Sequence, residues 1–339
     1  MAASTPNPQT VALRVRSALK EAIARLAAAG VPSHTLAAEL LLMHALGRDR
    51  AWLYSHSEES LPPATAAEFF ALVARRAAGE PTQYLTGKQE FWGLEFEVTP
   101  AVLIPRPETE HLIEVALDRL RAQASLKGQP PAAPLRIADV GTGSGCLAVA
   151  LARELPHAEI FATDISEPAL AVARRNAARH NVAHRIHFLS GNLLDPLLHD
   201  SEHESGITNH GSQITNYQSP LTSHRSPITN RQSPITNFHL IVSNPPYVAR
   251  REAPHLPREV RDHEPETALF GGPAGPEIYS ALINQAAALL RPGGILVLEL
   301  GYDSAPHVRA IFERDLRWSS VSITLDLAAI ERVLTAQLA

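Results

Sequence analysis

The stretch that decides the fold is Leu135–Ala152, which reads LRIADVGTGSGCLAVALA. It starts with an apolar run typical of a buried strand, passes through a glycine-rich turn and ends in a run typical of a helix. The turn consists of Gly141, Thr142, Gly143, Ser144 and Gly145. Glycines at a strand-to-helix turn let a ligand approach the backbone and leave the first helical amides free. We therefore expect these turn residues to bind a nucleotide-like cofactor at the carboxyl end of the strand.

Strand-like and helix-like runs alternate from Leu135 onward. The expected strands cover residues 135–140, 159–165, 185–191, 239–243 and 293–300, and the expected helices cover 144–154, 167–180 and 277–290. Apolar strands separated by helices are typical of a doubly wound, Rossmann-like parallel sheet of the α/β class. Two further β-type runs, at 320–327 and 332–338, lie too close together for a helical crossover. The sequence therefore predicts a seven-stranded sheet whose last strand is antiparallel.

The residues before the sheet divide into a helical part and a short linker. Helices are expected at 11–29, from a cap at Ser33 to Leu46, and at 64–78. Short connections between these helices predict a small helical bundle over residues 1–85. The run at 91–103 alternates apolar and polar residues, which predicts a β-hairpin linker over residues 86–104. Residues 105–339 then form the α/β domain.

Residues 200–237 interrupt the α/β pattern with a seven-residue repeat. An apolar residue recurs at Ile207, Ile214, Leu221, Ile228 and Ile235. A seven-residue period is typical of a coiled coil, but prolines recur in phase with it and would break any helix. One apolar residue per repeat also buries no continuous stripe. We interpret the segment as a disordered tandem insertion without a catalytic role.

The composition excludes several classes of protein. The chain has 339 residues and a formal net charge of −5, so no global positive field attracts nucleic acid. Its one cysteine, Cys146, excludes an internal disulfide and a cysteine-based zinc site. No apolar run reaches the roughly 18 residues of a membrane span, and the first residues lack the features of a signal peptide. We expect a monomeric, cytoplasmic protein with no membrane association and no bound metal.

A polar residue, Asp164, ends the second expected strand, and another, Asn192, follows the third. Asp164 lies 23 residues after Gly141, where a carboxylate can accept hydrogen bonds from both ribose hydroxyls of an adenosine. A helix N-cap is the alternative role for Asp164. Asn192 would border the adenine or serve as an ordinary turn residue. The dinucleotide-binding motif G-x-G-x-x-G has its third glycine where this chain has Cys146, which argues against NAD as the cofactor.

The tetrapeptide Asn244-Pro245-Pro246-Tyr247 directly follows the expected strand at 239–243. Two prolines fix the backbone and remove two N–H groups, so the local carbonyl oxygens stay free to accept hydrogen bonds. The Asn244 side-chain oxygen and the Pro245 carbonyl can bind both N–H bonds of a planar NH₂ group. This binding draws the nitrogen toward tetrahedral geometry and frees the lone pair that resonance delocalises. Tyr247 can stack on the planar group and exclude water.

S-adenosylmethionine, which contains an adenosine, carries the methyl group that completes this arrangement. In-line displacement from its sulfonium requires no metal and no covalent intermediate. It requires a nitrogen about 3–3.5 Å from the methyl carbon and aligned with the breaking bond. A neutral, desolvated pocket favours the reaction because positive charge leaves the sulfonium as the new bond forms. These residues predict methylation of a nitrogen on a planar NH₂ group.

Longer segments resemble the release factor glutamine methyltransferases, the HemK/PrmC family. The resemblance rests on AELLLMHALGRDR (38–50), YLTGKQEFWGLEFEVTPAVLIPRPETE (84–110), IADVGTGSGCLAVALA (137–152), FATDIS (161–166), VSNPPYV (242–248) and DLAAIERVLTAQ (326–337). The combination of LIPRPETE, at 103–110, with NPPY is specific to this group. On these motifs the chain is identified as a member of the family, which belongs to the class I S-adenosylmethionine-dependent methyltransferases.

The resemblance implies a substrate and a role for each motif. The substrate would be the glutamine in the GGQ loop of peptide chain release factors, methylated on the side-chain N5 by direct in-line transfer. Binding of the cofactor would fall to Gly141, Thr142, Gly143, Ser144, Gly145, Asp164, Asn192 and Asn244. Asn244 and Pro245 would be the catalytic pair that binds the amide, and Pro246 and Tyr247 would shape its pocket. The N-terminal bundle would dock the release factor.

Two other hypotheses account for parts of the pattern. An N6-adenine methyltransferase would use the same tetrapeptide, since adenine also carries a planar NH₂ group that base flipping can deliver. The negative net charge argues against a nucleic-acid substrate, and the pair Arg174-Arg175 is interpreted as a solvated helix face. A non-catalytic adaptor would use only the helical bundle. The intact glycine turn and Asn244 argue against the adaptor.

Overall fold

The computed structural model describes residues 13–127, 134–198 and 235–339. The predicted repeat insertion at 200–237 lies outside the described residues as far as residue 234. The first two residues of the helix expected at 11–29 lie outside them as well.

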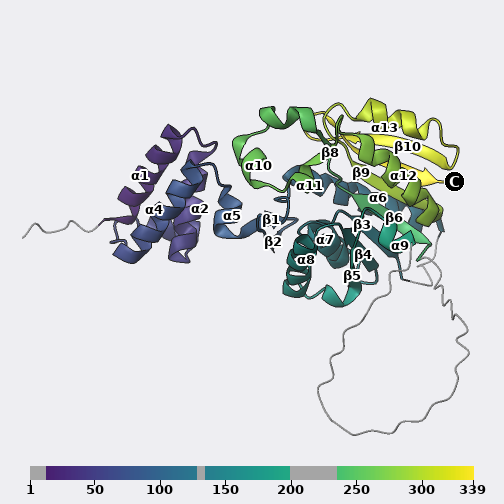
Figure 1. Ribbon diagram of the computed structural model, residues 1–339. Coiled ribbons are helices and arrows are strands. Elements are labelled where there is room, and N and C mark those ends of the chain that lie inside the picture. The colour runs from purple at the N-terminus through teal and green to yellow at the C-terminus, as the bar shows by residue number, and fades with distance from the viewer. Residues whose placement is uncertain (1–12, 128–133, 199–234) are drawn as a thin grey trace, which may run out of the picture.

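The N-terminal helices form a bundle with its own apolar core. They are α1 (Val15–Ala28), α2 (His34–Leu46), α3 (Arg50–Ser55), α4 (Pro63–Ala77) and α5 (Thr82–Thr86). Phe69 and aliphatic residues of α1, α2 and α4 make up most of that core, and Figure 1 shows the bundle beside the α/β domain. The α3 and α5 helices were not predicted, because they are too short to show a helical period.

The predicted side-chain cap at Ser33 is wrong. Ser33 has a left-handed backbone, with a φ of 49°, and its hydroxyl accepts no capping hydrogen bond. A capping side chain reaches the helix amides from an extended backbone, and Ser33 does not have one.

The linker contains the predicted hairpin, shifted toward the N-terminus. Strands β1 (Lys88–Phe91) and β2 (Leu94–Glu97) pair antiparallel. Trp92 and Gly93 form the turn between them, with φ angles of 55° and 67°, as in a two-residue hairpin of type I′. The expected hairpin at 91–103 therefore began three residues too late, and residues 98–103 form no strand.

The sheet has the predicted architecture. Its strands, β3 (Arg136–Val140), β4 (Glu159–Asp164), β5 (Ile186–Ser190), β6 (Phe238–Ser243), β9 (Leu290–Glu299), β10 (Trp318–Leu325) and β11 (Glu331–Leu338), lie in the order β10-β11-β9-β6-β3-β4-β5. The β11 strand is antiparallel to both of its neighbours, and the pairs between β5 and β9 are parallel. The strand order reverses between β3 and β6, where doubly wound sheets bind ligands at the carboxyl ends of the strands.

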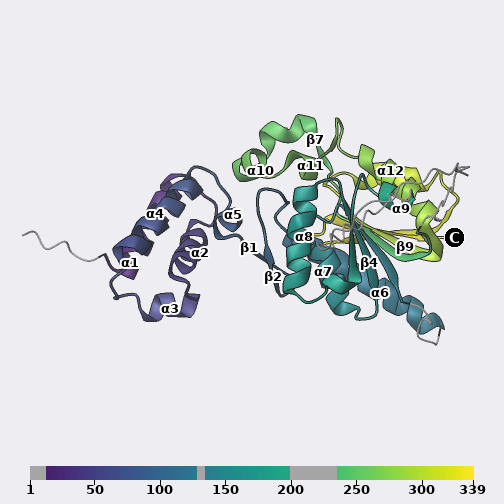
Figure 2. The ribbon, with the colours of Figure 1, turned by 60° about the horizontal axis from the view of Figure 1, so that its bottom comes forward.

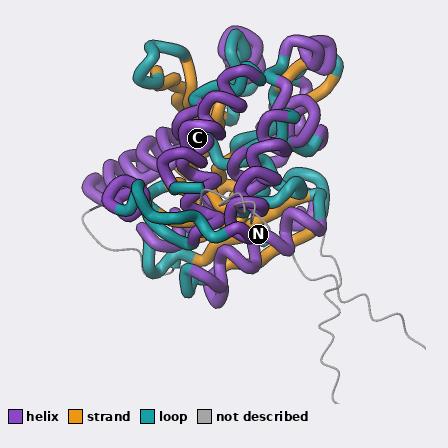
Figure 3. The backbone as a smooth tube through the Cα atoms, turned by 90° about the vertical axis from the view of Figure 1, so that its left-hand side faces the viewer, coloured by secondary structure: helices purple, strands orange, loops and turns teal. Residues whose placement is uncertain are grey.

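Helices cover both faces of the sheet. One face packs against α6 (Glu110–Lys127), α7 (Cys146–Glu154) and the end of α8 (Glu167–Arg179). The other face packs against α9 (Asp195–Leu198), α12 (Glu277–Leu289) and α13 (Ala305–Phe312). Burial on both faces explains the nearly continuous apolar strands. Figure 3 shows the molecule from the bundle side, with helices in purple and strands in orange. The α6 helix was not predicted.

The connection from β6 to α12, residues 244–276, crosses the carboxyl edge of the sheet. It contains β7 (Val248–Ala249), η3 (Arg250–His255), α10 (Arg258–His263), α11 (Glu266–Leu269) and β8 (Phe270–Gly272). Figures 1 and 2 show α10 on the side of the α/β domain that faces the bundle. Two ion pairs of 2.5 Å hold the connection: Arg76 of α4 with Glu259, and Arg106, which directly precedes η1 (Pro107–Thr109), with Glu264.

Short 3₁₀ helices complete the described chain at η1 (Pro107–Thr109) and η2 (Ala183–Arg185). Within the described ranges, no helix is both long enough and apolar enough to cross a membrane.

Candidate active site

A cavity of about 370 Å³ opens at the carboxyl edge of the sheet. The sequence-predicted residues that line it are Gly141, Gly143, Asp164, Asn192, Asn244 and Pro246. The linker adds residues 101–103, and the β6–α12 connection adds Arg250 and residues 265–268. The predicted residues outside this lining are Thr142, Ser144, Gly145, Pro245 and Tyr247. The fold thus brings the ends of β3, β4, β5 and β6 to one space, where both a cofactor and a substrate group can meet.

The glycine turn has the backbone that its sequence requires. Gly141, Gly143 and Gly145 have φ angles of 70°, 55° and 81°, which side chains rarely adopt. A Cβ at Gly145 would also lie 3.0 Å from the Cβ of Ala173. Thr142 and Ser144 are buried, so they shape the turn rather than its cavity side.

Asp139, at the end of β3, supports the turn from below. Its Oδ2 accepts from the Thr142 hydroxyl at 2.6 Å and from the Ala148 amide at 3.1 Å. Its Oδ1 is buried and has no partner among the described residues. Burial raises the pKa of Asp139 to about 7, against the opposing effect of these two hydrogen bonds. An unpartnered buried carboxylate oxygen beside a glycine turn fits a site for a cationic ligand group.

Asp164 presents its carboxylate at the mouth of the turn. Its Oδ2 accepts from the Gly143 amide at 2.8 Å, and its Oδ1 accepts from the Ser166 amide at 2.9 Å. Ser166, and not Asp164, is the N-cap of α8. Each carboxylate oxygen keeps a second lone pair, so Asp164 can still accept from a diol. Burial raises the pKa of Asp164 above its usual value.

Asn244 directly follows β6, and its side chain is held by η1. Its Nδ2 donates to the Thr109 hydroxyl at 3.0 Å, so the donor end of the amide is occupied and its oxygen is the free end. Pro246 lines the cavity beside it. Tyr247 packs against the core below the site, and its hydroxyl donates to Glu299 Oε1 at 3.4 Å.

Known proteins match the chain along nearly its whole length. A family described as PrmC N-terminal domain matches residues 17–87, and a family described as Methyltransferase domain matches residues 137–218. Release factor glutamine methyltransferases from Koribacter versatilis and Moorella thermoacetica are 39% and 40% identical to this chain over 325 and 324 residues. Each alignment covers 96% of this chain, with 99% of the first relative and 98% of the second. The chain belongs to the release factor glutamine methyltransferase family.

The resemblance found in the sequence motifs is thereby confirmed, and so is the Rossmann-like methyltransferase fold. Among solved structures, the N-terminal domain of human METTL16 in complex with SAH is 17% identical to this family member, with a TM-score of 0.42. That alignment covers 83% of this chain and 85% of the METTL16 chain. So distant a likeness carries no argument about the ligands of this chain.

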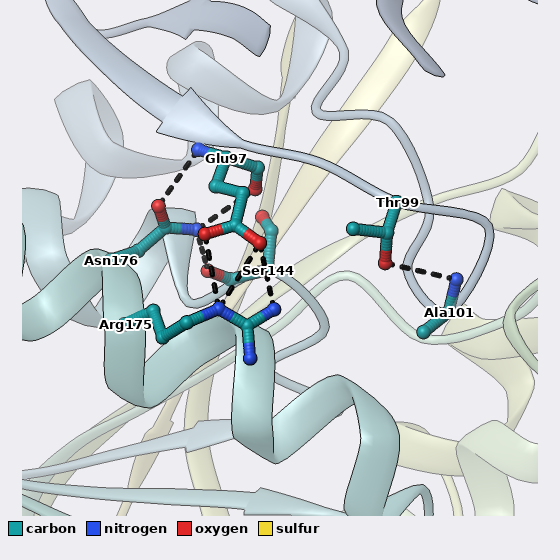
Figure 4. Close-up of polar contacts among 6 residues, drawn as sticks. All are labelled: Glu97, Thr99, Ala101, Ser144, Arg175 and Asn176. Carbon is teal, nitrogen blue, oxygen red and sulfur yellow. Dashed lines mark hydrogen bonds and ion pairs between the residues drawn. The ribbon is translucent and has the colours of Figure 1, made fainter. Parts of the chain in front are cut away.

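In this family member, Asn176 of α8 fixes the linker against the glycine turn. Its Oδ1 accepts from the Glu97 amide at 2.8 Å, and its Nδ2 donates to the Glu97 and Ser144 carbonyls at 3.0 and 2.9 Å. Figure 4 shows these bonds together with Arg175, which pairs with the Glu97 carboxylate at 2.7 Å. The Arg175 guanidinium lowers the pKa of Glu97. Arg174 and Arg175 are both exposed, as the interpretation of a solvated helix face requires, and Arg175 has Glu97 as a partner on that face.

The linker reaches the cavity a few residues after Glu97, which Asn176 holds. Thr99 accepts from the Ala101 amide at 3.3 Å, which turns the chain so that residues 101–103 line the cavity. Sequence analysis missed Asn176 because a polar residue in an amphipathic helix gives no sign that it is buried.

Two glycines of the β6–α12 connection let the tetrapeptide pack closely. A Cβ at Gly271 would lie 2.3 Å from the Pro246 carbonyl oxygen and 2.1 Å from that of Gly275. A Cβ at Gly275 would lie 2.5 Å from the Tyr247 carbonyl oxygen. Backbone atoms cannot yield as a flexible side chain can, so these glycines determine where the tetrapeptide lies.

We expect Gly271→Ala to displace the tetrapeptide, lowering both stability and methyl transfer. Overpacking of this kind costs about 1–3 kcal/mol. Thermal unfolding and an activity assay measure the two effects. Gly30→Ala is the control for activity: its φ of 70° strains an alanine and lowers stability, but nothing lies within 4 Å of the added Cβ, so the tetrapeptide is not displaced. Activity of Gly271→Ala equal to that of Gly30→Ala would contradict the role of this contact.

Other cavity residues gave no signal in the sequence. Arg250 pairs with Glu266 at 3.1 Å and lies over the Phe270 ring, 4.9 Å from its centroid. All three line the cavity. Their segment has neither a helical nor a strand period, and only the fold places it over the site. Among the described residues, no cluster of three or more metal-ligating side chains is present.

Proposed function

We propose that this chain methylates the side-chain N5 of the glutamine in the GGQ motif of peptide chain release factors, with S-adenosylmethionine as methyl donor. The observation that carries the proposal is the Asn244 amide. Its nitrogen is engaged by Thr109 at 3.0 Å, so its oxygen can accept from a second amide at the cavity that also holds Gly143 and Asp164. Family membership supports the substrate, because the relatives are named for it.

The residues at the ends of β3 and β4 fit the proposed cofactor. The positive φ angles of Gly141 and Gly143 leave room for a ligand at the backbone. The Asp164 carboxylate would accept from the ribose hydroxyls, and Asn192 would border the adenine. When bound, S-adenosylmethionine supplies an electrophilic methyl group for direct in-line transfer. Thr142, Ser144 and Gly145 would act by holding the shape of the turn.

The residues after β6 would bind and orient the side-chain amide of the substrate glutamine. Asn244 Oδ1 and the Pro245 carbonyl would accept its two N–H bonds and turn the nitrogen lone pair toward the methyl group. Pro246 would form the adjoining wall. Tyr247 lies below the site and donates to Glu299, so we propose that it supports the tetrapeptide from beneath. Tyr247 is not among the residues that line the cavity, so no contact in the structure supports the expected stacking of its ring on the substrate amide.

The proposed partner of the chain is the release factor, and its proposed location is the cytoplasm. The bundle over residues 1–85 would dock the release factor, and the linker and α/β domain over 86–104 and 105–339 would present the site. The enzyme would act as a monomer in the cytoplasm, where release factors work. It would need no metal, membrane or nucleic acid.

Incubation of the chain with a release factor and S-adenosylmethionine tests the proposal. We expect mass spectrometry to find one added methyl group on the GGQ peptide. A release factor whose GGQ glutamine is replaced by alanine should stay unmodified. Methylation of duplex DNA in a parallel reaction, with none on the release factor, would favour the adenine hypothesis. Calorimetry that detects no binding of S-adenosylmethionine would favour the adaptor.

A further inference from the structure

A buried chain of hydrogen bonds runs from Asn244 to a carboxylate at the end of β9. Asn244 Nδ2 donates to Thr109 Oγ1 at 3.0 Å, and Thr109 Oγ1 donates to Glu299 Oε2 at 2.7 Å. The Tyr247 hydroxyl donates to the other oxygen, Glu299 Oε1, at 3.4 Å. Thr109 is 3% exposed and Glu299 is 1% exposed. Neither residue lines the cavity, so neither is placed to contact the substrate directly.

The order of donors in this chain decides which way the Asn244 amide points. An ionised carboxylate only accepts hydrogen bonds, and a hydroxyl has a single hydrogen to donate. Since Thr109 gives its hydrogen to Glu299, its oxygen can only accept from Asn244. Only the NH₂ end of the amide can donate, so that end faces Thr109 and the oxygen takes the opposite direction. An amide is nearly symmetric in shape, so packing alone would not make this choice.

We propose that Thr109 and Glu299 are positioning residues, which fix the Asn244 amide with its oxygen toward the substrate. The inference rests on the proposed function, because it concerns the group that would bind the glutamine. The reversed amide would point two N–H groups at the two N–H bonds of the substrate, and the nitrogen would lose an acceptor. Thr109 belongs to the LIPRPETE run, so the inference gives that motif a role at the tetrapeptide, 135 residues away.

Protonation of Glu299 would remove the constraint. A neutral carboxyl can donate to Thr109, which would then be free to donate to Asn244 Oδ1 and reverse the amide. Burial raises the pKa of Glu299 to about 7. Arg332 of β11 and the Thr109 and Tyr247 hydroxyls oppose this rise, while Glu108 adds to it. The other titratable groups near Glu299 are Cys146 and Tyr279. The active, ionised form therefore predominates above pH 7 and is lost as the pH falls below it.

The first test removes the Thr109 hydroxyl. We expect Thr109→Val to lower kcat at least about tenfold, corresponding to one lost hydrogen bond at the upper end of its usual range. The dissociation constant for S-adenosylmethionine should change less than about twofold, because Thr109 lies outside the cofactor end of the site. Thr109→Ser keeps the hydroxyl and should restore kcat. Thr163→Val is the matched control, because the Thr163 hydroxyl is buried without a partner among the described residues.

The second test uses pH and does not depend on Thr109→Val being folded. At saturating cofactor and release factor, we expect kcat of the wild type to fall as the pH decreases through about 7. Glu299→Gln cannot titrate at this position, so the acid limb of its kcat should be weaker than in the wild type, leaving only what Asp139, whose pKa is also raised to about 7, contributes. Thermal unfolding of each variant shows whether the variant is folded. A folded variant with a low kcat has a misoriented Asn244 amide, whereas a misfolded one has lost activity for another reason.

The results separate the positioning role of Thr109 and Glu299 from the proposed methylation of the release factor. A folded Thr109→Val with wild-type kcat would overturn the positioning role, and so would a Glu299→Gln profile whose acid limb matches that of the wild type. Absence of release factor methylation by the wild type would instead refute the proposed function, before any variant is compared.

Discussion

Asn244→Ala should lower methyl transfer to the release factor by about 10²-fold or more while the protein still binds S-adenosylmethionine. Losses of this size follow the removal of one preorganised polar group from other active sites. The variant removes the oxygen that would accept one substrate N–H. It leaves the glycine turn and Asp164 unchanged, so calorimetry should find a cofactor affinity close to that of the wild type.

The control for this variant is an asparagine far from the cavity. Asn284 is exposed on α12, where its Nδ2 donates to the Ser280 carbonyl. Asn284→Ala should therefore keep full activity, measured as methyl incorporation into the release factor. Turnover by Asn244→Ala at the rate of Asn284→Ala would refute the acceptor role of Asn244.

Asp164→Ala should weaken the binding of S-adenosylmethionine by about 10²-fold or more. A hydrogen bond to a charged group contributes about 1.5–3 kcal/mol, and two ribose hydroxyls would be involved. The variant also frees the Gly143 and Ser166 amides that the carboxylate now holds, which adds to the loss by loosening the turn. Calorimetry measures the dissociation constant directly.

Two further variants make this measurement specific. Asp164→Asn keeps one acceptor oxygen, so its affinity should fall between those of the wild type and Asp164→Ala. Glu167 is an exposed residue at the start of α8, the helix that follows Asp164, and Glu167→Ala removes its negative charge. Its affinity should be unchanged. An Asp164→Ala dissociation constant equal to that of Glu167→Ala would exclude Asp164 as the ribose ligand.

The sequence predicted every strand of the sheet. The inner strands β3, β4, β6 and β9 are largely buried and leave nearly continuous apolar runs, whereas the edge strands β5 and β10 are partly exposed and were recognised by their β-type residues. It also predicted the antiparallel β11, since the five residues between β10 and β11 cannot hold a crossover helix. Errors fell where the local pattern carries little information. The hairpin was placed late because alternation continues past Glu97, and the amphipathic α6 was not recognised.

The candidate site was predicted in part. The glycine turn, Asp164, Asn192 and Asn244 were found because each lies at or just after the end of a strand, and strand ends meet at one edge of a parallel sheet. Their surroundings were not found. Asn176 and Arg250 give no periodic or motif signal, and Gly271 reveals its role only through the 2.3 Å that a Cβ would leave to Pro246.

The sequence by itself determined the order of the elements, the glycine turn and the chemical identity of the tetrapeptide, because these depend on local pattern and residue type. Only the tertiary structure decided which way Asn244 faces. Its partner Thr109 is 135 residues away, and the carboxylate that orders the chain is a further 190 residues from Thr109. Hydrogen bonds over such separations depend on how η1 packs against the ends of β6 and β9, and that packing leaves no trace in the sequence near any one of the three residues.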